Sequence, residues 1–246
     1  AWRETHAARH PASRLGRARR GRSRRARVRR PARAARYRQA MAAITVDVWS
    51  DLVCPWCYIG KSRLERALAE EPPGSVEVRW HAFQLDPSIP AEGADAEAYH
   101  RSRFGDLTRV REMRERVREV AAQDGLDLRF DLQKRAPNTL LAHRATKIAP
   151  DPDAAIQTLF AAHFEQGEDI GDRDTILRLL PDVDPAALDR GDAGDLVAAD
   201  LELARRIGIT GVPFFVAGMR VAVSGAQPPE VLRQFLAEGR ARAEAA

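Results

Sequence analysis

Residues 44–57 read Ile-Thr-Val-Asp-Val-Trp-Ser-Asp-Leu-Val-Cys-Pro-Trp-Cys, and this stretch decides how the rest of the chain is interpreted. In its first part, Ile44–Trp49, β-branched apolar residues alternate with other side chains, which predicts a β-strand. It ends with Cys54-Pro55-Trp56-Cys57, which contains the only two cysteines among the 246 residues. Pro55 suits the first turn of a helix, where a missing N–H costs nothing. The stretch therefore predicts a strand followed by a helix that begins at the cysteine motif.

Two cysteines separated by two residues at the start of a helix are typical of thiol-disulfide redox chemistry. The positive end of the helix dipole and the unpaired N–H groups of the first turn lie beside Cys54 and favour its thiolate, which is the nucleophilic form. Cys57, one turn further along, is then the resolving thiol that attacks the mixed disulfide and releases the substrate. We interpret Cys54 and Cys57 as the catalytic residues.

Other uses of the two cysteines are less well supported. A structural zinc site needs four ligands, and the chain offers neither a second Cys-x-x-Cys nor a histidine pair at zinc-finger spacing, so we predict no metal. A permanent structural disulfide would close a ring of only four residues, which removes little chain entropy from the unfolded state. Two inert buried cysteines are the third alternative to a redox dithiol.

The composition of the chain changes at Met41. Residues 1–40 hold fifteen arginines and one acidic residue, Glu4, and thus carry a net charge of +14, whereas the whole chain carries +5 and residues 41–246 therefore carry −9. A segment so rich in arginine and so poor in large apolar side chains cannot bury enough surface to offset the entropy of ordering. We predict that residues 1–40 are a disordered tail and that the fold lies in residues 41–246.

Three roles for the tail follow from its composition. It could bind nucleic acid through the phosphate charges, it could be an organelle presequence, or it could be upstream sequence added by a misplaced start, with Met41 opening the natural protein. We favour the third interpretation, because everything after Met41 indicates one complete domain. The sequence shows neither the apolar core of a secretory signal nor a stretch long enough to span a membrane. We therefore predict a cytoplasmic protein.

The pattern of apolar residues after the motif predicts the order of the elements. A helix ends before Pro72-Pro73, and alternation over Ser75–His81 predicts a second strand, so that this part is a βαβ unit. Helical spacing of apolar residues then recurs in four segments of the middle of the chain: 110–120, 141–148, 156–164 and 176–180. We interpret His143 and His163, which fall in these segments, as structural histidines.

The first of these middle helices has two kinds of side chain. Apolar residues at intervals of three and four are expected to face the core: Val110, Met113, Val117 and Val120. Arginines interleave with acids, and we interpret them as a solvated face rather than a ligand site: Arg109, Arg111, Arg114, Arg116 and Arg118.

The last part of the chain returns to α/β structure. A helix over 196–204 precedes a β-hairpin of Phe214–Ala217 and Arg220–Val223, and a final helix follows Pro228-Pro229. The order is βαβ, a helical block of roughly a hundred residues, then αββα. We predict an α/β domain made of residues 41–90 and 193–246, with residues 91–192 inserted as a helical domain. The groove between the two parts is the expected place for substrate.

Several motifs in combination resemble a known family. The pair of Cys54-Pro55-Trp56-Cys57 and Gly208-Ile209-Thr210-Gly211-Val212-Pro213-Phe214-Phe215 resembles the DsbA family of the thioredoxin superfamily. Further segments resemble its FrnE-like branch: Ser50-Asp51, Tyr58–Lys61, Pro137–Thr139, Ala142–Arg144 and Ser224–Gln227. The resemblance spans residues 44–238 and implies a thioredoxin-like fold with an inserted all-helical domain.

This resemblance also implies a second half of the active site. In the family the proline of the second motif is cis, which carries over to Pro213. A cis X-Pro bond turns the chain so that the backbone beside Val212 can meet an extended peptide, while the proline ring lies against the dithiol. We therefore expect Pro55, Trp56, Val212 and Pro213 to bind substrate.

The implied function is that of a protein-disulfide oxidoreductase whose redox-active disulfide is its only cofactor. Its partners would be a protein or small-molecule disulfide and a thiol reductant or oxidant. Trp56 stands where the best-known periplasmic oxidants have a histidine, so one positive charge beside Cys54 is missing. We expect a reduction potential within about −270 to −120 mV. The chain lacks the extra C-terminal cysteine pair of some FrnE-like proteins, which excludes a mechanism that needs it.

Two alternatives come from different classes of protein. Glutathione S-transferase kappa and 2-hydroxychromene-2-carboxylate isomerase resemble this layout and bind glutathione, but they have a serine at the position of Cys54. A glutathione-linked isomerase or transferase, with glutathione as co-substrate, is therefore the enzymatic alternative. The non-enzymatic alternative is nucleic-acid binding through residues 1–40, which we regard as the weaker one.

Overall fold

The computed structural model describes residues 44–245, and the predictions for residues 1–40 lie outside this range. β1 (Ile44–Ser50), α2 (Pro55–Leu68) and β2 (Val76–Ala82) form the predicted βαβ unit, in which β1 and β2 are parallel. Near the C-terminus, β5 (Phe214–Ala217) and β6 (Val221–Ser224) form the predicted hairpin and lead into α10 (Pro229–Glu244). β5 pairs antiparallel with β1, which gives a four-stranded sheet in the order β2-β1-β5-β6.

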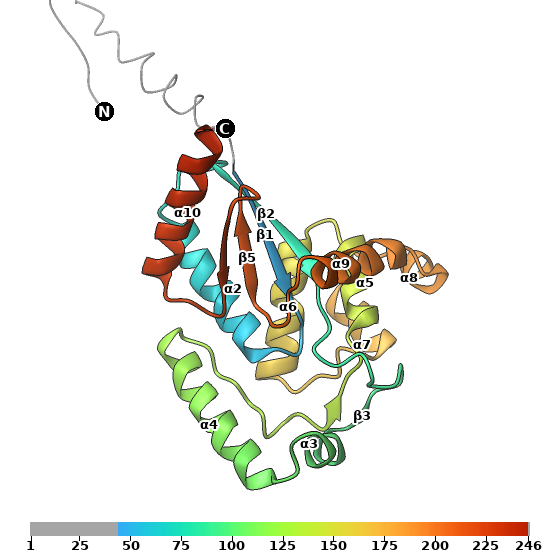
Figure 1. Cartoon of the computed structure of the whole chain (residues 1–246). Coiled ribbons are helices and arrows are strands. Elements are labelled where there is room, and N and C mark those ends of the chain that lie inside the picture. The colour runs from blue at the N-terminus through green and yellow to red at the C-terminus, as the bar shows by residue number, and fades with distance from the viewer. Residues whose placement is uncertain (1–43, 246) are drawn as a thin grey trace, which may run out of the picture. The chain divides into compact units, whose positions relative to one another are not determined.

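The central strand, β1, is covered on both faces (Figure 1). Val46 and Val48 pack in one hydrophobic cluster with residues of α2 and α10, whereas Trp49 packs on the other face with α9 (Gly194–Arg206). α10 approaches β5 so closely that a Cβ added at Gly239 would lie 2.5 Å from the Cβ of Ala217. Residues 46–50 are all buried, so the end of β1 that leads to the cysteine motif lies in the core.

The middle of the chain is helical, as predicted, with a short pair of strands. Its elements are β3 (Ala94–Asp95), α3 (Ala96–Phe104), α4 (Leu107–Gln123), β4 (Arg135–Ala136), α5 (Leu140–Ile148), α6 (Pro152–Glu165), α7 (Arg173–Leu179) and α8 (Pro185–Arg190). Helices α4 to α7 correspond to the four segments with helical spacing. Helices α3 and α8 and the β3–β4 pair were not predicted.

Aspartate caps begin five of these helices. In each case the carboxylate accepts a hydrogen bond from a backbone N–H of the first turn: Asp95, Asp106, Asp151, Asp172 and Asp184. Such a cap contributes about 1 kcal/mol to the helix that it begins. The two unpredicted helices escaped a search for periodicity because α3 buries only Ala96 and α8 has only six residues. Their caps were readable in the sequence.

One prediction for α4 was wrong. Met113, expected to face the core, is 41% exposed. The buried positions are Val110, Val117 and Ala121, and the fourth member of that stripe, four residues after Val110, is Arg114. The pattern with Met113 fits the 3.6-residue period almost as well, so periodicity alone could not separate the two faces.

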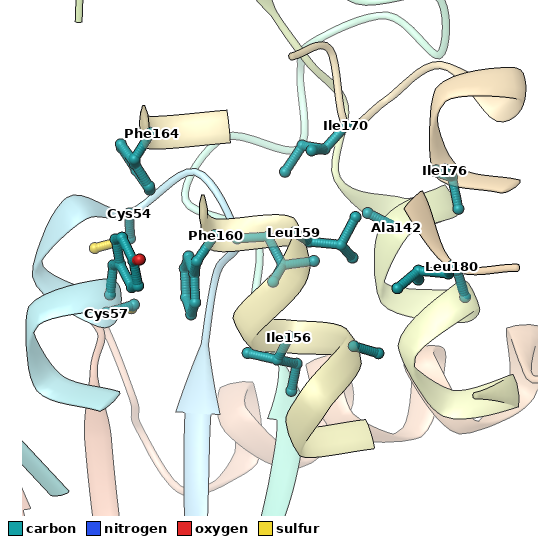
Figure 2. Close-up of a cluster of buried hydrophobic side chains, with 14 of the residues drawn as sticks. Cys54, Cys57, Ala142, Ile156, Leu159, Phe160, Phe164, Ile170, Ile176 and Leu180 are labelled. Carbon is teal, nitrogen blue, oxygen red and sulfur yellow. The ribbon is translucent and has the colours of Figure 1, made fainter. Parts of the chain in front are cut away.

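A single hydrophobic cluster joins the cysteine motif to the helical block. It contains Cys54, Cys57 and Tyr58 as well as buried residues of α4, α5, α6 and α7. Figure 2 shows the two cysteines at the first turn of α2, with Phe160 and Phe164 of α6 beside them. Each large apolar side chain buried here contributes roughly 1.5–3 kcal/mol. None of the helices between residues 44 and 245 is long and apolar enough to cross a membrane.

Candidate active site

The two cysteines lie where β1 leads into α2. A turn after β1, in which the Cys54 N–H donates to the Asp51 carbonyl at 3.0 Å, makes Cys54 the N-cap residue of α2. Pro55 begins the helix, and the Cys57 N–H donates to the Cys54 carbonyl at 3.0 Å. Both cysteines are free thiols. Cys54 thus sits beside the N–H groups of the first helical turn, where no side chain caps them.

A second segment, remote in sequence, meets Cys54 at this point. The Val212–Pro213 peptide bond is cis. The Cys54 thiol donates to the Val212 carbonyl, with 3.7 Å between Sγ and the oxygen. Pro213 is buried beside α2, because a Cβ added at Gly60 would lie 2.9 Å from its Cγ. The structure therefore brings together the two motifs that the sequence paired.

Cys57 lies deeper than Cys54, with exposed fractions of 1% and 4%. Burial raises the pKa of the Cys57 thiol well above its ordinary value, and the neighbouring Cys54 raises it further. The Asp51 backbone N–H and the Ser50 hydroxyl act in the opposite direction, because they stabilise the Cys57 thiolate. The Ser50 hydroxyl has no partner by strict hydrogen-bond geometry within the described range. We regard the Cys57 sulfur as its acceptor once that sulfur is ionised.

A cavity of about 410 Å³ opens beside Cys54. The side of the cavity next to α2 is lined by Cys54, Pro55, Trp56 and Val212. Cys57 and Pro213 do not line the cavity. The helical block provides the facing wall, which includes Tyr99, His100, Arg103, Phe104, Met113, Arg114, Val117, Phe130 and Phe164. The groove expected between the two parts of the fold is therefore present, with four of the six predicted site residues on its surface. Trp56 is 39% exposed there.

The facing wall was not predicted, and the prediction for Arg114 was wrong. Arg114 is not on a solvated face: it is half-buried, and its guanidinium carbon lies 5.1 Å from the centroid of the Phe130 ring. The other four arginines of that set are exposed, as predicted. The signal that could have found Arg114 is its register with Val110, Val117 and Ala121. A larger hollow of about 730 Å³ shares Arg114 with the cavity but does not reach the cysteines.

His143 and His163 are both buried and hydrogen-bonded to backbone carbonyls, as expected of structural histidines. The His143 Nε2 lies 3.0 Å from the Phe83 carbonyl, and the His163 Nδ1 lies 3.2 Å from the Glu168 carbonyl. Burial lowers the pKa of His163 to about 4. His163 also lines the cavity, where it is therefore neutral at physiological pH.

Comparisons with known proteins agree with this arrangement. The model of the DSBA-like thioredoxin domain family matches residues 45–237. The uncharacterized protein YwbO of Bacillus subtilis (strain 168) is 27% identical over 205 residues, which cover 79% of this chain and 96% of that protein. The family match includes the cysteine motif, the helical block and the loop that contains Pro213.

Solved structures show the same fold. A probable DsbA oxidoreductase, SCO1869 from Streptomyces coelicolor, is 30% identical with a TM-score of 0.72, and the match covers 80% of this chain and 89% of that one. The cytosolic disulfide reductase DsbM from Pseudomonas aeruginosa, in a structure with GSH, is 22% identical with a TM-score of 0.52 over 82% and 98% of the two chains. The predicted thioredoxin-like fold is confirmed, whereas the FrnE-like branch stays a prediction. The chain belongs to the DsbA-like thioredoxin-domain family.

Proposed function

We propose that the protein is a thiol-disulfide oxidoreductase in which Cys54 attacks the substrate and Cys57 resolves the mixed disulfide. Proteins of the DsbA-like family act on disulfides together with thiol redox partners. The observation that carries the assignment of roles is the unequal placement of the two thiols: Cys54 lines the cavity, and Cys57 is buried behind it. A substrate in the cavity can therefore meet only the first thiol.

The reaction transfers two electrons. The Cys54 thiolate attacks one sulfur of the substrate disulfide, the S–S bond breaks, and the first substrate thiol leaves. Cys57 then loses its proton and attacks the Cys54 sulfur, which forms the Cys54–Cys57 disulfide and releases the second substrate thiol. The raised pKa of Cys57 keeps this thiol protonated until the mixed disulfide has formed. A separate thiol reductant regenerates the dithiol.

The test uses the Cys54→Ser and Cys57→Ser variants with a small disulfide and intact-mass measurement. We expect Cys57→Ser to accumulate a mixed disulfide on Cys54, because the resolving thiol is missing. We expect Cys54→Ser to form almost none, because Cys57 does not line the cavity. An adduct on Cys57 in the Cys54→Ser protein, with none in the Cys57→Ser protein, would reverse the roles.

The thiol reductant of this cycle is proposed to be glutathione or a thiol protein, and the dithiol itself is proposed to be the only redox group. Glutathione is a candidate because any low-molecular-weight thiol that enters the cavity can attack the Cys54–Cys57 disulfide. An assay that couples substrate reduction to glutathione oxidation tests this. Turnover with a dithiol reductant but none with glutathione would show that another thiol serves. A cytoplasmic location stays a prediction.

A further inference from the structure

Arg114 is a positive charge without a negative partner. It projects from α4 into the wall of the cavity, half-buried, and its guanidinium lies over the Phe130 ring. Within residues 44–245 it has no salt bridge: its one side-chain hydrogen bond goes to His100, with 3.1 Å between Nη2 and Nε2. Burial lowers the pKa of Arg114, but a guanidinium stays charged in proteins. Keeping such a group half-buried and unpaired costs free energy, which a bound anion would recover.

His100 holds this guanidinium in place without neutralising it. The His100 Nδ1 is hydrogen-bonded to the Ala96 carbonyl one helical turn earlier. Nδ1 therefore carries the proton, and Nε2 presents a lone pair that accepts the N–H of Arg114. Burial and the charge of Arg114 lower the pKa of His100, which favours the neutral imidazole. The remaining N–H groups of Arg114 are available to a ligand.

The rest of the cavity combines positive charge with an apolar lining. Arg103 and Arg135 also line it. Of its two carboxylates, Asp86 accepts hydrogen bonds from Tyr99 and Ser88, and Asp51 accepts one from the Leu85 N–H. Asp86 is thus engaged by other groups. Asp51 uses Oδ2 for its bond to Leu85, and its buried Oδ1 lies 3.6 Å from the His143 Nε2 with no hydrogen-bond partner within residues 44–245. Neither carboxylate pairs with Arg114 in this part of the chain.

We propose that the cavity binds a small disulfide that has an apolar, aromatic body and a carboxylate, with Arg114 as the anion-binding residue. This inference rests on the proposed oxidoreductase function and names its substrate class. Phe130 and Phe164 would contact the body of the substrate, and the guanidinium would bind the carboxylate through charge-assisted hydrogen bonds. A volume of about 410 Å³ is in the range of small-molecule sites. Electron transfer to this substrate follows the two-step exchange given above, with two thiols as products.

Two chromogenic aromatic disulfides separate charge recognition from reactivity. Dithiobis(nitrobenzoate) has a carboxylate on each ring, whereas dithiodipyridine has none. The second-order rate of each with the reduced protein is measured by stopped flow, for the parent, Arg114→Gln and Arg114→Lys. We expect Arg114→Gln to lower the ratio of the carboxylate rate to the neutral rate roughly ten- to hundredfold, and Arg114→Lys to restore part of it.

The matched control is Arg111→Gln, which removes the same charge from the same helix. Arg111 is exposed and lines only the larger hollow. If Arg111→Gln lowers the ratio as much as Arg114→Gln, the effect is general electrostatics and the proposal fails. An equal loss with both disulfides in Arg114→Gln, or no loss with either, overturns it as well.

A binding measurement keeps this proposal separate from the proposed function. The Cys54→Ser/Cys57→Ser protein cannot exchange disulfides, but its cavity wall is intact. Calorimetric titration with the thiol product, thionitrobenzoate, should show saturable binding that weakens at least tenfold when Arg114→Gln is added. Absence of binding in the double-serine protein would refute the subsite even if disulfides are reduced. Binding without any disulfide reduction by the parent would leave the subsite standing and refute the oxidoreductase.

Discussion

Ser50 and Cys57 meet at the point where β1 ends, and the hydroxyl of Ser50 is buried with an exposed fraction of 4%. The pKa of Cys57 is raised by burial, and the Ser50 hydroxyl offsets part of that effect by stabilising the thiolate. The resolving step requires this thiolate. We therefore expect Ser50 to act as a positioning residue for Cys57.

We expect Ser50→Ala to raise the pKa of Cys57 further and to lengthen the life of the mixed disulfide about tenfold, as the loss of a hydrogen bond to a charged group predicts. Thiolate absorbance gives the titration, and quenched-flow mass measurement gives the lifetime. Ser75→Ala is the control, because the Ser75 hydroxyl is equally buried and also lacks a hydrogen-bond partner among the residues that the structure describes. Equal lifetimes in the two variants would remove Ser50 from the mechanism.

Single residues also differ in whether their role could be predicted from the sequence. Cys54 and Cys57 could be predicted as site residues because they are the only cysteines in the sequence. The position of Arg114 could not be predicted in this way, because it depends on contacts with Phe130 and His100 that form only when the chain folds. An arginine among acids is usually solvated. Only its place in a buried stripe of α4 distinguished it from Arg111.

At the level of elements, the contact between α2 and the Pro213 loop requires a residue without a side chain. A Cβ at Gly60 would lie 2.9 Å from the Cγ of Pro213 and 3.3 Å from the Cζ of Phe215. Both neighbours are buried and cannot move away freely. The helix that carries the cysteines and the loop that carries Val212 are thus held at a distance set by Gly60.

Gly60→Ala should destabilise the protein by roughly 1–3 kcal/mol, because overpacking in a core has this cost, and should slow the reaction of Cys54 as the two motifs separate. Chemical denaturation and the stopped-flow rate measure the two effects. Gly194→Ala provides the comparison, since a Cβ there meets nothing within 4 Å. A Gly60→Ala protein as stable as the parent would mean that α2 shifts without cost.

The elements that the sequence predicted and those that it did not differ in what stabilises them. β1, α2, β2, the β5–β6 hairpin and α10 each bury a regular pattern of apolar residues, so their pattern was sufficient. Helix α3 buries almost nothing of its own and is held by its cap at Asp95 and by contacts with α4 and the β3–β4 pair. The part of the cavity wall that α3 forms could not be predicted. The spacing of apolar residues within α3 or α4 does not show how the two helices pack against each other.

At the scale of the whole molecule, a cluster of charged side chains connects the sheet with helices α9 and α5. His81 of β2 lies between two carboxylates, with its Nε2 2.8 Å from Asp47 of β1 and its Nδ1 2.7 Å from Asp200 of α9. Lys147 of α5 also pairs with Asp200, at 2.7 Å. Three elements therefore meet at one imidazole, which stacks on Trp49, and α5 joins the cluster through Asp200.

This cluster makes stability depend on pH with a definite sign. Burial alone would lower the pKa of His81, but hydrogen bonds to Asp200 and Asp47 outweigh it, and the pKa is raised above 6.5. The charged imidazole therefore stabilises the folded state below that ordinary value, and the contribution is lost as the pH rises through the folded-state pKa. The pKa of His163 is lowered by burial to about 4, which gives the opposite trend.

We therefore expect His81→Gln to reduce the free energy of unfolding more at about pH 5.5 than at about pH 8.5. Urea denaturation of parent and variant at both pH values gives the difference. His163→Gln should show the reverse, with its cost shrinking as the pH falls, because the parent must then keep a neutral histidine buried. An equal cost of His81→Gln at both pH values would show that His81 is not charged in the fold.

The hydrophobic cluster that contains both cysteines also limits how this protein can be redesigned or can diverge. Buried residues of α4 and α6 contact α2 and share one hydrophobic cluster with both cysteines, so we expect that exchanging the helical block would disturb the packing of the cysteine motif. Its replacement would expose Tyr58 and the sulfur atoms to water, with the dithiol losing its low-dielectric surroundings. We therefore expect new specificities to arise from point changes on the cavity wall, at positions such as Met113 and Arg114, where a side chain can change while the core beneath it stays constant.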